Sequence, residues 1–176
     1  PILDRLAEAS GELVRLGVIE GRFPSQRLVW VAKAQGAHGG LRYDPDMGAE
    51  AALSCTASGH AWLACLSDED ALTLVSRQGL SRGAQRGPNA PRTLKEVLAR
   101  LKLARAKGYA RVVDSASPGM AALAAAVRHP VGGQVLGIVS RSPSELQPVL
   151  DAIVESAGRL CQAEYALIFK LEDGSY

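Results

Sequence analysis

Hydrophobic and polar residues alternate along the chain with two different periods, which predict helices in some stretches and strands in others. Residues 1–10 place apolar side chains at the spacing of a short amphipathic helix, and Gly11 follows as a natural stop. Residues 12–19 and 27–35 are instead apolar and β-branched, with the breaker-rich GRFPSQ between them. The first part of the chain is therefore predicted to form a helix and a hairpin with a long turn.

Two later helices are marked by their first residues. Ser67 precedes acidic residues and is expected to cap one helix. Thr93 and Glu96 form a capping box at the start of a second helix over residues 93–107, which has an apolar stripe and a basic last turn. Residues 78–92 combine glycines, prolines and arginines without periodicity, so a loop is expected there. Its arginines either bind phosphate or point into water.

Three strands are predicted next, over residues 109–114, 120–128 and 134–141, and the turns between them are short. Parallel strands need a long crossover, so these three are expected to form an antiparallel meander. Residues 144–147 open a last predicted helix, and residues 165–171 form a last strand. The expected fold class is α/β in composition and α+β in arrangement, with helices packed on the faces of an antiparallel sheet.

The stretch from Leu53 to Leu66 has the order expected of a ligand site at the start of a helix. It begins with small polar residues, carries Gly59, and ends in the apolar run AWLACL. Small side chains let a bound group approach backbone N–H groups that have no partner inside the helix. The alternative is an ordinary core helix with a face of small residues, and this segment alone leaves both interpretations open.

Composition narrows the class of protein. The 176 residues suit one domain with a full core, and 47% hydrophobic with 22% charged residues argues against a disordered chain. A net charge of +2 gives no support for binding to nucleic acid or a membrane surface. Three cysteines, an odd number, fit a reducing cytoplasm better than a disulfide scaffold. Because the sequence begins at Pro1 and not at methionine, we expect it to be a piece of a longer protein.

No catalytic or metal-binding constellation is recognised in the sequence. Cys55 and His60 are five residues apart, which turns them to different sides of a continuous helix. In such a helix they cannot share a metal ion or act as nucleophile and base. The motifs of phosphate-binding loops, nucleophile elbows and zinc proteases are missing. We therefore expect no enzymatic activity, no metal and no cofactor.

A charged residue ends the last strand of the predicted meander. Alternation puts Val139 and Arg141 on one face, so that an arginine closes a largely apolar row. A guanidinium at the rim of an apolar cavity is suited to hold a carboxylate or a phenolate. The alternative is an arginine that lies along the surface with its charged end in water.

Five segments, in their order along the chain, resemble the effector-binding domain of IclR-family transcription regulators over residues 1–160. They are LDRLAEASGELVRLGVIEG, TASGHAWLACL, RAKGYARVVDSASPGM, AALAAAV and GIVSRSP. The resemblance implies a GAF-like fold, a curved antiparallel sheet with helices on its faces, that binds a small anionic or aromatic metabolite. It also implies a cytoplasmic regulator that works as a homodimer or tetramer and contacts no membrane. Such a regulator reaches DNA through an N-terminal winged helix-turn-helix outside this sequence.

By position in the family's motifs, the resemblance points to seven ligand-binding residues. It implies backbone contacts at the start of the central helix, mostly apolar walls and one fixed positive charge. The seven residues are Ala57, Ser58, Gly59, Val112, Ala122, Val139 and Arg141. His60 stands where the family usually has lysine, and the last two of the seven stand where paired serines are found. The ligand is thus expected between the sheet and the start of this helix.

Residues 161–176 extend past the family's usual end. Together with the segment before them they echo the opening of the chain, in which a helix, a small-residue stop, an apolar strand and an acidic-glycine turn follow one another. They look like the start of a second GAF-type module. The alternative for the whole protein is therefore a GAF-type sensor module of a multi-domain signalling protein, such as a histidine kinase or a cyclase regulator.

Overall fold

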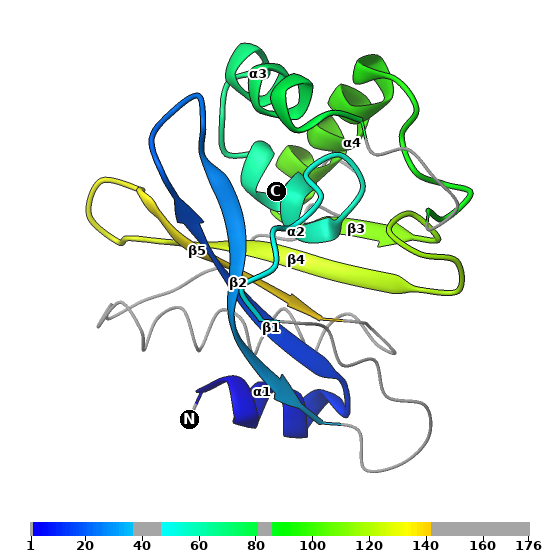
Figure 1. The fold of residues 1–176 in the computed structure, drawn as a ribbon. Helices are drawn as coiled ribbons and strands as arrows, with labels where there is room; N and C mark the ends of the chain where they lie inside the picture. The colour runs from blue at the N-terminus through cyan, green and yellow to red at the C-terminus, as the bar shows by residue number, and fades with distance from the viewer. Residues whose placement is uncertain (1, 37–46, 81–85, 142–176) are drawn as a thin grey trace.

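Five strands form an antiparallel sheet in the computed structural model, which describes residues 2–36, 47–80 and 86–141 (Figure 1). The order across the sheet is β2-β1-β5-β4-β3. The strands are β1 (Leu13–Glu20), β2 (Arg27–Gln35), β3 (Ala110–Val113), β4 (Ala121–Arg128) and β5 (Val135–Arg141). The predicted hairpin (β1–β2) and meander (β3–β5) are confirmed, and β1 pairs with β5 to join them.

Helices cover both faces of the sheet. They are α1 (Ile2–Ser10), α2 (Ala57–Leu63), α3 (Asp68–Gln78) and α4 (Leu94–Lys107). Figure 1 shows α2, α3 and α4 gathered over one face, while α1 lies against the other. The predicted α+β arrangement, an antiparallel sheet between helices, is confirmed.

The helix starts follow the predicted caps. Thr93 Oγ1 accepts a hydrogen bond from the Glu96 N–H at 3.2 Å, and Glu96 Oε2 accepts one from the Arg92 N–H at 2.7 Å. The predicted capping box is thus present, with one difference: the Glu96 side chain accepts from the N–H of Arg92 and not from that of the cap residue Thr93. Ser67 caps α3 in the same way. α4 ends at Gly108, whose positive φ of 75° suits a left-handed helix terminus.

Each face of the sheet has its own hydrophobic core, because helices exclude water from both sides. The core under α2–α4 includes Leu28, Trp30, Trp62, Leu63, Leu101 and Ile138. The core on the α1 side includes Leu6, Ala7, Val14, Leu123, Val127 and Val139. Consecutive residues of β5 therefore enter different cores, Ile138 under α2 and Val139 toward α1.

The central helix is shorter than the stretch from which it was predicted. α2 contains residues 57–63, and a turn over residues 53–56 precedes it. Residues 47–51 run beside β2, where the Ala51 N–H donates to the Leu28 carbonyl at 2.8 Å. The predicted helix from residue 144 and the predicted strand over residues 165–171 lie outside the described residues. Among the helices that the structure describes, none is long and apolar enough to span a membrane.

Candidate functional site

The start of α2 is held by its own cap. Thr56 Oγ1 accepts a hydrogen bond from the Gly59 N–H at 3.0 Å and donates one to the Ala52 carbonyl at 2.7 Å. The N–H of Gly59 is therefore already used inside the protein. The other two backbone positions predicted to meet a ligand, Ala57 and Ser58, are the first two residues of α2, where N–H groups have no partner inside the helix.

Gly59 is needed by the chain itself. A Cβ atom at this position would lie 2.5 Å from the carbonyl oxygen of Leu53, much closer than side chains approach backbone atoms. The turn over residues 53–56 can fold against α2 only because residue 59 has no side chain. The glycine predicted to open the way for a ligand instead permits this close packing.

His60 stabilises the same turn. Its ring nitrogen Nε2 lies 2.9 Å from the Ser54 carbonyl oxygen, and the side chain is 2% exposed. Burial lowers the pKa of His60 and outweighs the hydrogen bond to Ser54, which raises it; the positive charge of Arg100 lowers it further. A neutral ring that donates from Nε2 is consistent with this contact. In the described part of the chain, no group of three or more metal-ligating side chains comes together.

Five of the seven predicted site residues come together. Val112 on β3 and Ala122 on β4 are cross-strand neighbours, and both pack with the core under α2. Ser115, just after β3, donates its hydroxyl to the Cys55 carbonyl at 2.8 Å and so joins the end of β3 to the turn before α2. The buried residues Ala57, Ser58 and Gly59 therefore lie at the end of the sheet where β3 ends and β4 begins.

Val139 and Arg141 lie on the other face of the sheet, so the structure does not bring all seven residues together, and the part of these two in ligand binding stays a prediction. Arg141 pairs across the sheet with Val14 and Leu123, which belong to the core on the α1 side together with Val139. The sheet itself separates this arginine from α2. Burial lowers the pKa of Arg141, and the carboxylate of Glu12 opposes that change.

Two polar side chains that the sequence analysis did not single out, those of Ser140 and Arg86, carry buried polar atoms, and Ser140 lies on the α2 side of the sheet. Ser140 is 2% exposed, and its register neighbour on β4 is Ala124 of the core under α2. In the described part of the chain, the Ser140 hydroxyl and the Arg86 nitrogen Nη1 are buried atoms that make no hydrogen bond. The nitrogen Nε of Arg141 is a third such atom, in a residue that has other interactions. Such atoms are rare, because desolvating a polar group without a partner costs about 1–3 kcal/mol.

The chain beside Arg86 is fixed to the end of β3. The Gly87 N–H donates to the Ser115 carbonyl at 3.2 Å, and the Asn89 N–H donates to the Asp114 carbonyl at 2.8 Å. Residue 87 must be glycine, because a Cβ there would lie 1.9 Å from the Asp114 carbonyl oxygen. Arg86 therefore comes from the loop predicted over residues 78–92 to the end of the sheet where α2 begins.

The fold and the site together define a class of protein. It is an α+β domain in which a short capped helix covers an antiparallel sheet, with a serine hydroxyl buried on that side. Over residues 1–161 the chain matches the family described as "Bacterial transcriptional regulator IclR C-terminal". The chain belongs to this family, as its motifs predicted.

Individual relatives agree with the family. The chain is 28% identical over 166 residues to the HTH-type transcriptional regulator BhcR of Paracoccus denitrificans, covering 91% of this chain and 57% of the relative. An IclR transcriptional regulator from Alicyclobacillus acidocaldarius has the same fold, with a TM-score of 0.74 and 23% identity, over 92% of this chain and 64% of that one. The chain thus spans less than two thirds of these relatives.

A third relative was solved with a ligand. The inducer-binding domain of a double mutant of PobR from Acinetobacter, in complex with 3-hydroxybenzoic acid, has a TM-score of 0.72 and 19% identity. The match covers 91% of this chain and 93% of that one. At this identity the likeness shows the fold alone.

Proposed function

We propose that this chain is the effector-sensing part of a transcription regulator and that its effector is a small aromatic monocarboxylate. Two observations carry the proposal: the buried hydroxyl of Ser140 on the α2 side of the sheet, and the buried Nη1 of Arg86, whose neighbour Gly87 is hydrogen-bonded to Ser115 after β3. A carboxylate accepts hydrogen bonds from a hydroxyl and from a guanidinium, and the second bond is charge-assisted. The 3-hydroxybenzoic acid bound by the PobR domain supports the choice of ligand class.

The ligand in this proposal lies between α2 and the strands β3–β5. Val112 and Ala122 are its apolar walls, and the backbone N–H groups of Ala57 and Ser58 are the nearest donors from α2. Arg86 supplies the positive charge that the sequence analysis assigned to Arg141. The proposed site thus lies where the sequence predicted it, between the sheet and the start of α2, but its positive charge comes from Arg86 and not from Arg141.

Isothermal titration with benzoate, 3-hydroxybenzoate and 4-hydroxybenzoate tests the proposal. We expect at least one of the three acids to bind the chain. Arg86→Gln should weaken binding about ten- to hundredfold, because a hydrogen bond to a charged group contributes about 1.5–3 kcal/mol. Ser140→Ala should weaken it about three- to tenfold, as expected for a neutral donor.

Two arginines on the other face are matched controls. Arg111 on β3 pairs with Leu123 of the α1-side core and is exposed, and Arg141 lies on the same side. Arg111→Gln and Arg141→Gln should bind the acid as the parent chain does. The proposal is overturned if none of the three acids binds, or if Arg141→Gln abolishes binding while Arg86→Gln does not.

For the whole protein we propose a non-enzymatic, cytoplasmic regulator that acts as a homodimer or tetramer. It would bind DNA through an N-terminal winged helix-turn-helix, because the chain covers 57% of a relative whose name marks it as an HTH-type regulator. Ligand binding under α2 would change the packing that positions this DNA-binding part, with a coupling energy of about 1–3 kcal/mol. Family membership favours this function over a module of a histidine kinase or cyclase regulator.

A domain boundary near residue 160 is part of the same proposal. The family match ends at residue 161, which agrees with an effector-binding domain over residues 1–160. We keep the proposal that residues 161–176 begin a second GAF-type module, on the sequence echo described above; they lie outside the described residues.

A further inference from the structure

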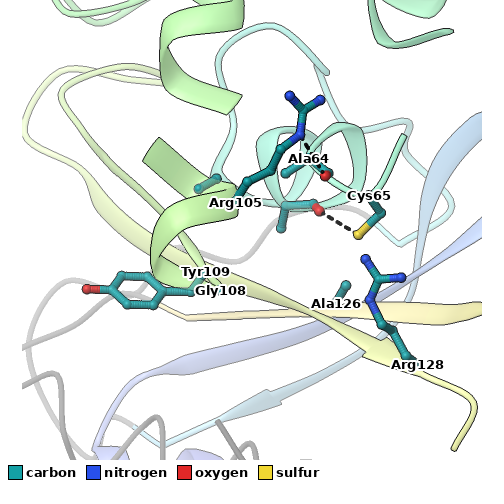
Figure 2. Close-up of a pocket in the computed structure, with 9 residues that line it drawn as sticks. Ala64, Cys65, Arg105, Gly108, Tyr109, Ala126 and Arg128 are labelled. Carbon is teal, nitrogen blue, oxygen red and sulfur yellow. Dashed lines mark hydrogen bonds between the residues drawn. The ribbon is translucent and has the colours of Figure 1, made fainter. Parts of the chain in front are cut away.

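A cavity of about 220 Å³ lies at the opposite end of α2 from the proposed effector site. It opens where α2 and α4 end and where β4 approaches its turn, as Figure 2 shows. The space exists because its walls carry small side chains, with Gly108 at the end of α4 and four alanines: Ala61, Ala64, Ala104 and Ala126. A cavity of about 150 Å³ is enough to hold benzene, so this one has room for a single ring with a small substituent.

Arg105 closes one wall and is fully engaged there. It donates hydrogen bonds to the carbonyls of Ala64 at 3.1 Å and Leu66 at 3.0 Å, and its guanidinium lies 2.6 Å from the Asp68 carboxylate. These contacts satisfy carbonyl groups beyond the last turn of α2, which a cation stabilises. The charge of Arg105 is balanced by Asp68, so this residue shapes the cavity and is not its anion site.

Arg128 brings a second positive charge to the cavity from β4. Its Nη1 donates to the Gly133 carbonyl at 3.1 Å, and Figure 2 shows its guanidinium beside the thiol of Cys65. The thiol donates to the Ala61 carbonyl at 3.2 Å. Burial raises the pKa of Cys65 more than the nearby Arg128 lowers it, so the thiol stays neutral.

We propose that this cavity is a second small-molecule site, which takes a compact monocarboxylate with an apolar body. The carboxylate is held by the guanidinium of Arg128, and the apolar body lies against the alanine methyl groups. The C-termini of α2 and α4 also face this region, and the partial negative charge of a helix C-terminus disfavours a bound anion. At the C-terminus of α2 this partial charge is already compensated by Arg105, which donates to the carbonyls there. The carboxylate therefore binds on the Arg128 side. α2 separates the two sites by about 10 Å, the length of seven helical residues.

The thiol of Cys65 reports on occupancy of the cavity. The chain has three cysteines, and the experiment uses a Cys161→Ser variant, which leaves Cys55 and Cys65. Cys55 is 2% exposed, so alkylation of this variant is expected to occur at Cys65. The rate of its alkylation by N-ethylmaleimide is measured with increasing benzoate and, in parallel, with the neutral analogue benzyl alcohol. Benzoate should slow alkylation in a saturable way, and benzyl alcohol should do so only at much higher concentration.

Four variants locate the effect, each compared with its own rate without benzoate. Arg128→Gln should raise the benzoate concentration for half-maximal protection about tenfold or more, whereas Lys107→Gln, an exposed neighbour on α4, should not change it. Ala126→Leu should fill the cavity and abolish protection; its thermal unfolding shows whether it folds. Ala122→Leu, which fills the proposed effector site, should leave protection unchanged.

Several results would overturn the second site. Loss of the protection of Cys65 in Ala122→Leu would show that benzoate acts only from the effector site. Equal protection by benzoate and benzyl alcohol, or protection that survives Arg128→Gln, would show that the cation does not hold the ligand. Because Cys65 is followed here and Arg86 is varied in the titration above, the two proposals fail independently.

Discussion

Single residues decide both what the site looks like and what the sequence could not reveal. Gly59 and His60 lie in the motif that points to a ligand, yet both hold the turn over residues 53–56 against α2. Arg86 and Ser140 carry the buried atoms on which the proposed site depends; Arg86 lies outside the family motifs, and Ser140 lies inside GIVSRSP but not at a position predicted to bind. Their burial depends on contacts between distant segments, which the residue types alone do not specify.

The buried histidine should make the stability of the domain depend on pH. Burial lowers the pKa of His60 from its usual 6.5, so the unfolded chain takes up a proton where the folded protein does not. The free energy of unfolding is then undiminished above pH 6.5 and falls as the pH drops below it, by at most about 1.4 kcal/mol for each unit of pKa difference. Urea denaturation between pH 7.5 and 5.5 measures this loss.

His60→Gln tests the assignment of this pH dependence. The variant is expected to be less stable at neutral pH because ring packing is lost, but its stability should change less between pH 7.5 and 5.5. His129→Gln, in the exposed turn between β4 and β5, is the control and should keep the slope of the parent. An unchanged slope in His60→Gln would show that another group is responsible.

Helices and strands were predicted correctly where capping residues and short turns determine them locally. Caps at Ser67 and Thr93 and the short turns of the meander predicted the helices and the antiparallel strands correctly. The alternation of β5 was also predicted correctly, but not which of its faces lies under α2. Both Ile138 and Val139 are buried, because helices cover both sides of the sheet, so the pattern of this strand does not distinguish them.

The cap of α4 permits a direct test at this scale. Thr93→Ala removes the side chain that accepts from the Glu96 N–H and should lower the free energy of unfolding by about 1 kcal/mol. Thr93→Ser keeps an acceptor and should retain most of the stability. Thr73→Ala, inside α3, has no cap to lose and should have little effect or stabilise slightly. Equal stability of the alanine and serine variants at residue 93 would contradict the cap.

At the scale of the whole molecule, the sheet is a partition with a different environment on each side. α1 and the core with Val139 and Arg141 lie on one side, and α2, the proposed effector site and the second cavity lie on the other. In the proposed site a ligand under α2 would contact β3–β5, and β5 is hydrogen-bonded to β1, which packs against α1. We therefore expect ligand binding on one side of the sheet to affect α1 on the other through these contacts.

The most direct test of the central claim is a crystal structure of the chain with 3-hydroxybenzoate. The account predicts the aromatic ring between α2 and β3–β5, with its carboxylate within hydrogen-bonding distance of Arg86 and the Ser140 hydroxyl. A crystal in which the acid is bound on the α1 side at Arg141, or in which the space beneath α2 holds no acid at saturating concentration, would contradict it.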